Sequence, residues 1–154
     1  MLPRVKWGLI TGGAVAILNL CGGVLMGVVN NCLAIVTVTI ATIVAGYFCA
    51  RQEPTEDAVR AGGIAGAIIE GINLISQLIG GILGGLVGTG ILASFTPQAK
   101  ADPASFTQAV GLGISIIVVT TVVVGLILVL GCAGIGALTA KLAMPYVSSI
   151  RYNK

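Results

Sequence analysis

The sequence predicts an all-α, polytopic membrane protein, a single domain of residues 1–154 with four transmembrane helices in an antiparallel bundle. Three observations predict this class. The 154 residues are 56% hydrophobic and only 8% charged, with a mean hydropathy of +1.08, whereas soluble domains are about 25% charged. Four apolar runs, at about 7–29, 32–50, 61–94 and 108–140, are each long enough to cross a ~30 Å bilayer core as a helix. Only short polar segments separate them.

The first two runs are expected to form a tight helical hairpin. Run 7–29 exceeds the ~7–15 apolar residues of a signal peptide, so we expect an uncleaved first transmembrane helix. Asn30 and Asn31 are the only polar break before the second run, and asparagine suits a tight turn. Run 32–50 is rich in β-branched residues, but an open strand in lipid would leave its backbone unsatisfied, so a helix is favoured.

The longest polar segments mark the next helix boundaries. Pro54 lies in the segment 51–60 and prevents a straight helical continuation. Thr55, followed by two acidic residues, is typical of a helix start, so we assign those acids no catalytic role. The third helix then begins at about Thr55 or Gly62, and a proline-containing loop at 95–108 follows it. We expect the fourth helix to end at Lys141, because Pro145 opposes simple continuation.

The basic residues predict the topology. If each of the four runs crosses the membrane once, seven of the eight basic residues lie on one side of it, and Lys100 alone lies on the other. Because Lys and Arg are retained in the cytoplasm, both termini are expected to be cytoplasmic, in a prokaryotic inner (cell) membrane. The seven are Arg4, Lys6, Arg51, Arg60, Lys141, Arg151 and Lys154.

The third and fourth helices are predicted to be too long for a bilayer. Thirty-three helical residues span roughly 50 Å, against a core of ~30 Å, and ordinary tilt does not absorb the excess. Either their outer ends project as a hairpin, or the third run breaks at Gly80-Gly81 and Gly84-Gly85. A projecting hairpin would need cover from the facing helix or from another chain. Its apolar residues would be Leu86, Val87, Ile91, Leu92, Leu112, Ile114 and Ile116.

Glycine at four-residue spacing predicts close helix packing. In a membrane, small residues at this spacing let two backbones approach. The pattern leaves two interpretations open, packing within one chain and self-association. The glycines concerned are Gly23, Gly27, Gly62, Gly66, Gly80, Gly81, Gly84, Gly85 and Gly88.

Glu70 is the only acid expected near the membrane midplane, with Asn73 and Gln77 on the same helical face. Such residues face a bundle interior, a partner or a water path. One interpretation is an ion or proton site, or a polar pore lining. The other is a neutral buried carboxyl that is hydrogen-bonded to neighbouring helices, with four candidate partners: Asn19, Thr37, Thr39 and Thr42.

The chain lacks the residues that most catalytic and metal sites use. It has no histidine, and its four cysteines are scattered singly. Three of them lie inside apolar runs, where a thiol packs as a small hydrophobe, and Cys32 lies near a turn. We therefore expect no enzyme activity, catalytic residue, metal or cofactor, and no nucleic-acid partner. The partners expected are the lipid bilayer and the protein itself or other membrane subunits.

Two resemblances bear on function. The chain resembles the rotor proteolipids of V-type ATPases in its length, its four spans, its abundant glycine and its one buried acid. This resemblance is one of composition. Those proteins are duplicated hairpins with the carboxylate in the last helix, whereas Glu70 is in the third. Residues 45–47 with 61–66 resemble small prokaryotic membrane proteins of unknown function, which implies no activity.

The sequence therefore predicts a non-enzymatic integral membrane protein that acts through helix packing, as a homo-oligomer or as an accessory or structural subunit of a larger membrane complex. The alternative is an oligomeric channel or ion-translocating protein with a polar path at Glu70, Asn73 and Gln77.

Overall fold

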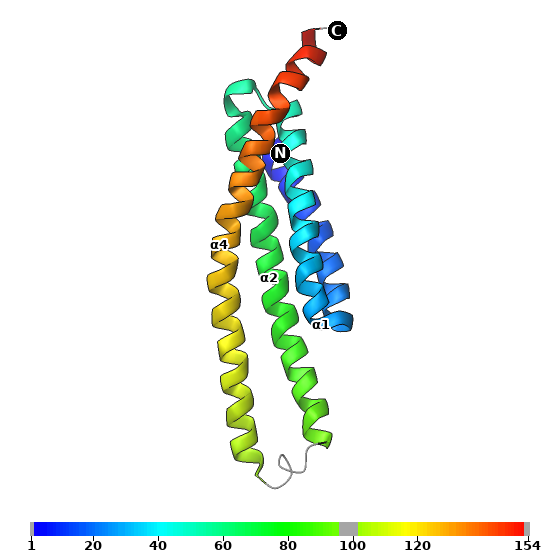
Figure 1. Ribbon diagram of the computed structural model, residues 1–154, viewed down its shortest axis with the longest axis vertical. Coiled ribbons are helices and arrows are strands. Elements are labelled where there is room, and N and C mark those ends of the chain that lie inside the picture. Colours follow the sequence, from blue (N-terminus) through cyan, green and yellow to red (C-terminus); the bar gives the residue numbers. More distant parts are fainter. Residues whose placement is uncertain (1, 96–101, 153–154) are drawn as a thin grey trace.

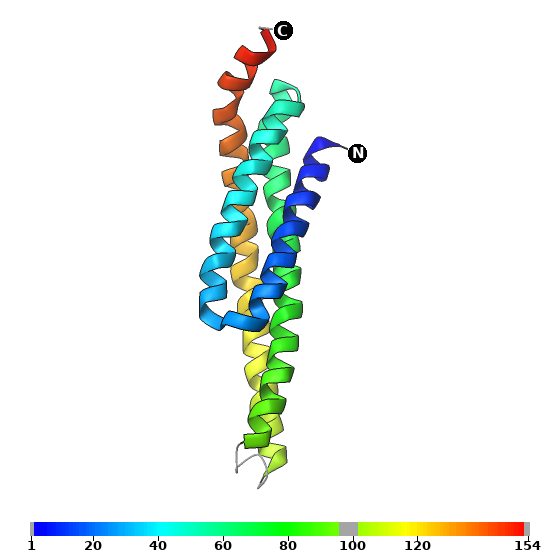
Figure 2. The same ribbon diagram turned by 90° about the vertical axis from the view of Figure 1, so that its right-hand side faces the viewer.

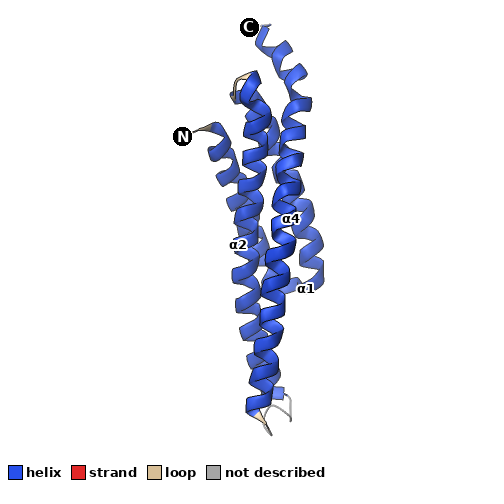
Figure 3. Ribbon diagram, turned by 90° about the vertical axis from the view of Figure 1, so that its left-hand side faces the viewer, coloured by secondary structure: helices blue, strands red, loops and turns tan. Residues whose placement is uncertain are grey.

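The structure, a computed structural model, describes the backbone of residues 2–95 and 102–152. Side chains are described throughout these ranges except at 21–33, 87–94, 117 and 148–152. The described residues form the helices α1 (Pro3–Gln52), α2 (Thr55–Phe95) and α4 (Pro103–Tyr152). No strand occurs among the described residues (Figure 3), which confirms the all-α class.

Helix α1 folds back on itself. The ring of Trp7 stacks on that of Phe48, with centroids 4.1 Å apart, and its Nε1 donates to Gln52 Oε1 at 3.0 Å. A straight helix would hold residues 41 apart at roughly 61 Å. The chain therefore reverses between Leu20 and Ala34, and α1 consists of a first arm, residues 3–20, and a second arm, Ala34–Gln52 (Figure 2). The side chains of the expected turn, Asn30-Asn31, lie outside the described residues.

Pro54 separates α1 from α2, as its position in the sequence predicts. Helix α1 ends at Gln52, and Glu53 leaves the helical conformation while its N–H still donates to Cys49 O. Helix α2 begins at Thr55, with the N–H groups of Asp57 and Ala58 both donating to Pro54 O. The acids of this first turn lie at the positive end of the helix dipole, where they are stabilising.

Helices α2 and α4 are 41 and 50 residues long. At 1.5 Å per residue they measure roughly 61 and 75 Å, about twice a bilayer core. Helix α2 runs without interruption past Gly80-Gly81 and Gly84-Gly85, so it does not break there. Together α2 and α4 extend well beyond the reversal of α1 (Figure 1).

The predicted bounds of the fourth helix are wrong at both ends. Helix α4 starts at Pro103 and continues through Lys141 and Pro145 to Tyr152. A proline inside a helix loses one backbone hydrogen bond and crowds the preceding turn, which kinks a helix without necessarily ending it. The last part of α4 leans away from the line of the rest (Figure 1).

Three segments of the described chain are long and apolar enough to cross a membrane: Ala34–Gln52, Thr55–Leu86 and Pro103–Val147. This indicates a membrane protein. The first expected span, 7–29, runs into the residues whose side chains are not described.

The inner half of α2 packs on α4 through glycine backbone. A Cβ at Gly62 would clash with Gly136 O, and one at Gly136 would clash with Gly62 O. A Cβ at Gly66 would meet Cys132 O and would lie 2.8 Å from Cys132 C. Only residues without a side chain fit at these approaches, so the predicted close contact at Gly62 and Gly66 occurs within one chain.

The outer glycines behave differently. A Cβ at Gly84 would meet nothing within 4 Å, and one at Gly80 or Gly85 would make only ordinary contacts, at 3.8 and 3.4 Å. Gly81 lines a narrow gap between α2 and α4. Gly23, Gly27 and Gly88 lie outside the residues whose side chains are described. The outer glycines at 80, 84 and 85 therefore make no glycine-dependent approach within this chain.

Candidate functional site

Three hydrogen-bonded side chains form a row in the interior between α1 and α2. Asn19 Nδ2, on the first arm of α1, donates to Asn73 Oδ1 at 2.6 Å. Asn73 Nδ2 donates in turn to the two carboxyl oxygens of Glu70, at 3.3 and 3.2 Å. Asn73 and Glu70 lie one turn apart on α2, which is why their side chains meet. The exposed fractions of Asn19, Asn73 and Glu70 are 6%, 2% and 2%, so all three side chains are buried.

Glu70 lies near the middle of Thr55–Leu86, the part of α2 that is long and apolar enough to cross a membrane. It is nine residues, or roughly 14 Å, along α2 from Ala61, which follows the last basic residue of the first turns. That distance is about half of a ~30 Å core. Small buried residues on the same stretch of α2 bring the neighbouring helices close on either side of it.

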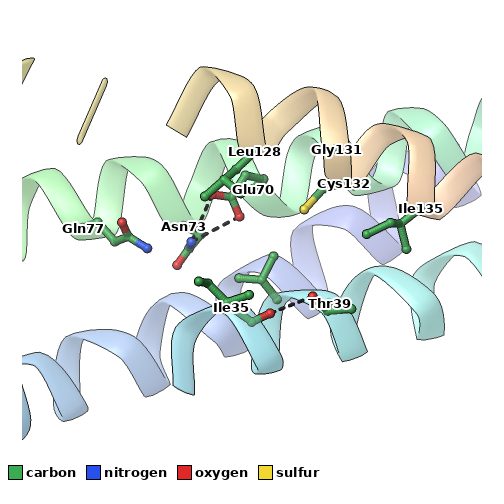
Figure 4. Close-up of a pocket in the computed structure, with 10 residues that line it drawn as sticks. Ile35, Thr39, Glu70, Asn73, Gln77, Leu128, Gly131, Cys132 and Ile135 are labelled. Atoms are coloured by element: carbon green, nitrogen blue, oxygen red, sulfur yellow. Dashed lines mark hydrogen bonds between the residues drawn. The ribbon is translucent and has the colours of Figure 1, made fainter. Parts of the chain in front are cut away.

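The carboxyl borders a cavity of about 180 Å³. In Figure 4, Glu70, Asn73 and Gln77 on α2 face the second arm of α1 and helix α4. The polar side of the cavity is formed by these three residues together with Thr39 and Cys132. The remaining lining is aliphatic or glycine: Ile35, Val38, Leu128, Gly131 and Ile135. The structure thus brings the three predicted residues together around one space.

The predicted hydrogen bonds from threonine to the acid do not form. Each of the three hydroxyls donates to a carbonyl of its own helix, at 2.7–3.0 Å. Such bonds to the preceding turn are the usual way in which helical threonine satisfies its hydroxyl. Thr37, Thr39 and Thr42 are therefore not partners of Glu70, whereas Asn19 joins it through Asn73.

Glu70 has no counter-charge among the described residues. Its hydrogen-bond partner is the neutral amide of Asn73, and no basic side chain contacts it in the described part of the chain. Burying an uncompensated charge in a low-dielectric interior is costly. The carboxyl therefore either stays neutral or has its charge balanced by something that enters the cavity.

Gln77 is half-buried at one end of the cavity, and its amide makes no hydrogen bond to the rest of the described chain. It also borders a second, much smaller space of about 10 Å³ next to Thr121 on α4. That volume is at the lower limit for a single water molecule. Gln77 thus lies between the cavity at Glu70 and this smaller space.

No group of three His, Cys, Asp or Glu that could hold a metal ion occurs in the described part of the chain. Cys132, buried beside Gly66, is the only thiol on the cavity. Its place there, like that of Thr39, depends on how α4 and α1 pack on α2. Thr39 was among the candidate partners of Glu70 in the sequence, whereas no spacing in the sequence points to Cys132.

In comparisons with known proteins, no family model, no curated protein and no solved structure matches this chain.

Proposed function

We propose that the protein is a non-enzymatic integral membrane protein that acts through helix packing, as a homo-oligomer or as an accessory or structural subunit of a larger membrane complex. In this proposal the two arms of α1, with α2 and α4, form a single domain of four antiparallel spans. Both termini face the cytoplasm of a prokaryotic cell, because the basic residues cluster at that end.

One observation carries the proposal: α4 bears no charged residue between Asp102 and Lys141. At 1.5 Å per residue this uncharged stretch is roughly 57 Å long, whereas a bilayer core is ~30 Å. A tilt of ~20° accounts for only about 2 Å of the difference. Wherever the membrane lies, more than 20 Å of uncharged helix remains outside its core.

The excess is concentrated where α2 and α4 extend past α1. We call this part the α2–α4 tip, residues 81–95 and 103–118. Here α2 and α4 pack against each other, as at Gly85 and Ile114, but large side chains point outward. Leu83, Leu112 and Ile116 are 56%, 62% and 66% exposed. Apolar surface of this kind outside lipid is typical of a protein–protein contact, so a second copy or another subunit would cover it.

A charge placed on the tip tests this proposal. Leu112→Glu should leave membrane insertion intact, because the residue lies outside the bilayer, but it should break the assembly. Leu130→Glu is the matched control, since Leu130 is 76% exposed and lies near the depth of the membrane centre. An acid there should impair insertion, at a cost near 3 kcal/mol. If Leu112→Glu left the assembly mass unchanged, the tip would not be the contact.

A second candidate function has its own support. We propose, as the alternative, an oligomeric channel or ion-translocating protein with a polar path at Glu70, Asn73 and Gln77. The observation that favours it is the cavity of about 180 Å³ against a buried acid without a counter-charge. Glu70→Gln should then alter cation flux into liposomes, and unchanged flux would remove the alternative.

A further inference from the structure

The Glu70 cavity has the character of a binding site for a small organic molecule. Its volume of about 180 Å³ compares with the ~150 Å³ aliphatic cavity that is known to hold benzene. One side presents the carboxyl of Glu70, and the opposite walls are aliphatic, from Ile35, Leu128 and Ile135. An occupant that matches this lining has one polar end and one apolar body.

The charge of the polar end follows from Glu70. The carboxyl has two acceptor oxygens, a single amide donor at 3.2–3.3 Å, and no basic residue in contact within the described chain. A positively charged group with N–H donors both balances the charge and supplies the missing hydrogen bonds. The amine is either protonated before it binds or takes its proton from the Glu70 carboxyl. In both cases the bound state consists of the Glu70 carboxylate and an ammonium ion.

Two other kinds of cation fit less well. A hard metal ion takes six to eight oxygen ligands, whereas the cavity offers one carboxyl and a few neutral oxygens. A quaternary ammonium has no N–H to donate and is typically held by aromatic rings. None of the residues that line this cavity is aromatic.

The cavity is reached from the side of the molecule. Ile35 on the second arm of α1 is 56% exposed, and Gly131 on α4 is exposed, with nothing within 4 Å of an added Cβ. Both line the cavity, and they lie on the two helices that flank its outer edge (Figure 4). At this depth the surroundings are lipid tails, so the ligand must partition into a bilayer.

We propose that this cavity binds a small, membrane-soluble alkylamine, with its ammonium group on Glu70 and its hydrocarbon body between α1 and α4. This inference rests on the second function proposed above, a cation site at Glu70, and names the class of cation. It is independent of the proposal that the α2–α4 tip is an assembly surface.

The test measures binding of cyclohexylamine to the full chain in lipid nanodiscs by calorimetry, with empty nanodiscs as the blank. We expect saturable binding of one amine per chain. Cyclohexanol, a neutral molecule of the same shape, and cyclohexyltrimethylammonium should both bind much more weakly. Equal affinity for cyclohexanol would overturn the proposal, because the charge would then contribute nothing.

Two substitutions locate the site. Glu70→Gln keeps the acceptor for Asn73 but loses the charge, so affinity should fall roughly tenfold to a hundredfold. Gly131→Leu should weaken binding by narrowing the opening, whereas Gly134→Leu should not. Gly134 is also exposed on α4 with open space around its Cβ, but it does not line the cavity. Full amine affinity in folded Glu70→Gln protein would contradict the proposal.

A parallel flux measurement separates this inference from the function on which it rests. If sodium or proton flux into liposomes depends on Glu70 while cyclohexylamine does not bind, the amine inference fails and the cation site stands. If neither flux nor binding depends on Glu70, both fail.

Discussion

Gly66 is the position at which a single methyl group should do the most damage. A Cβ there would clash with Cys132 O on α4, would lie 2.8 Å from Cys132 C, and would lie 3.1 Å from Thr42 Cγ2 on α1. Two of these three atoms belong to backbone, so no side-chain rotation relieves the contact. In Gly66→Ala, α4 must move away from α2 at the level of Cys132.

The size of the effect follows from these distances. Ordinary contact begins at about 3.4 Å, so α4 must retreat by at least ~0.6 Å, and by more to clear Cys132 O, a gap that forfeits a quarter or more of the dispersion energy of the neighbouring contacts. Overpacking of this kind costs about 1–3 kcal/mol. We therefore expect the free energy of unfolding of Gly66→Ala to fall by about 2 kcal/mol.

Gly71→Ala is the matched control, five residues further along α2. An added Cβ there meets nothing within 4 Å, and replacing glycine by alanine favours a helix by up to ~1 kcal/mol in water. Unfolding of both variants and the wild type would be followed by circular dichroism as SDS is titrated into mixed micelles. If Gly66→Ala were as stable as Gly71→Ala to within about 0.5 kcal/mol, the close approach of α2 to α4 would be refuted.

Two further predictions concern polar groups. A double-mutant cycle with Asn19→Ala and Asn73→Ala should give a coupling energy of about 0.6 kcal/mol, and at most ~1.7, in the same unfolding assay; strictly additive losses would mean that the two amides are not bonded. At the start of α4, hydrogen bonds from Ser105 lower the pKa of Asp102 below its usual 3.8. Because the folded-state pKa is depressed, this cap should stabilise the helix start fully above pH 3.8 and be lost as the pH falls through the lowered value. Carbon-13 NMR of the carboxyl should show a midpoint below 3.8 that rises in Ser105→Ala, and a midpoint unaffected by that change would contradict the cap.

The sequence predicts the helices better than their ends. Apolar runs and Pro54 are local signals, and they correctly predict helical structure and the boundary between α1 and α2. Pro145 is a local signal too, yet α4 continues through it. A proline inside a helix removes one backbone hydrogen bond and crowds the preceding turn. Helix propensity alone does not predict whether contacts of the residues after the proline offset this loss.

The acid site was partly predictable, because Glu70, Asn73 and Gln77 share a face by helical spacing alone. Asn19 was among the expected partners, but its bond to Asn73 rather than to Glu70 depends on how the first arm of α1 lies on α2. The contribution of Cys132 depends in the same way on α4.

Glycine spacing predicts close approach without identifying the partner. Gly62 and Gly66 make such approaches to the backbone of α4. Gly8 and Gly12, also four residues apart, make looser ones to α2, where the nearest atoms belong to the side chains of Ile68 and Ile72. Gly84 has the same spacing and meets nothing in this chain. Four-residue spacing of glycine shows that a helix can approach another backbone closely. Only the packing of the folded chain shows which glycines make such an approach.

The mass of the assembled protein in lipid tests the central claim most directly, because we propose that a second chain covers the α2–α4 tip. Native mass spectrometry of the wild-type protein, released from nanodiscs formed directly from membranes, would report it. We predict an integral multiple of the 15.4 kDa chain mass, or that chain together with a co-purifying subunit. A lone 15.4 kDa chain with no associated protein would contradict the account.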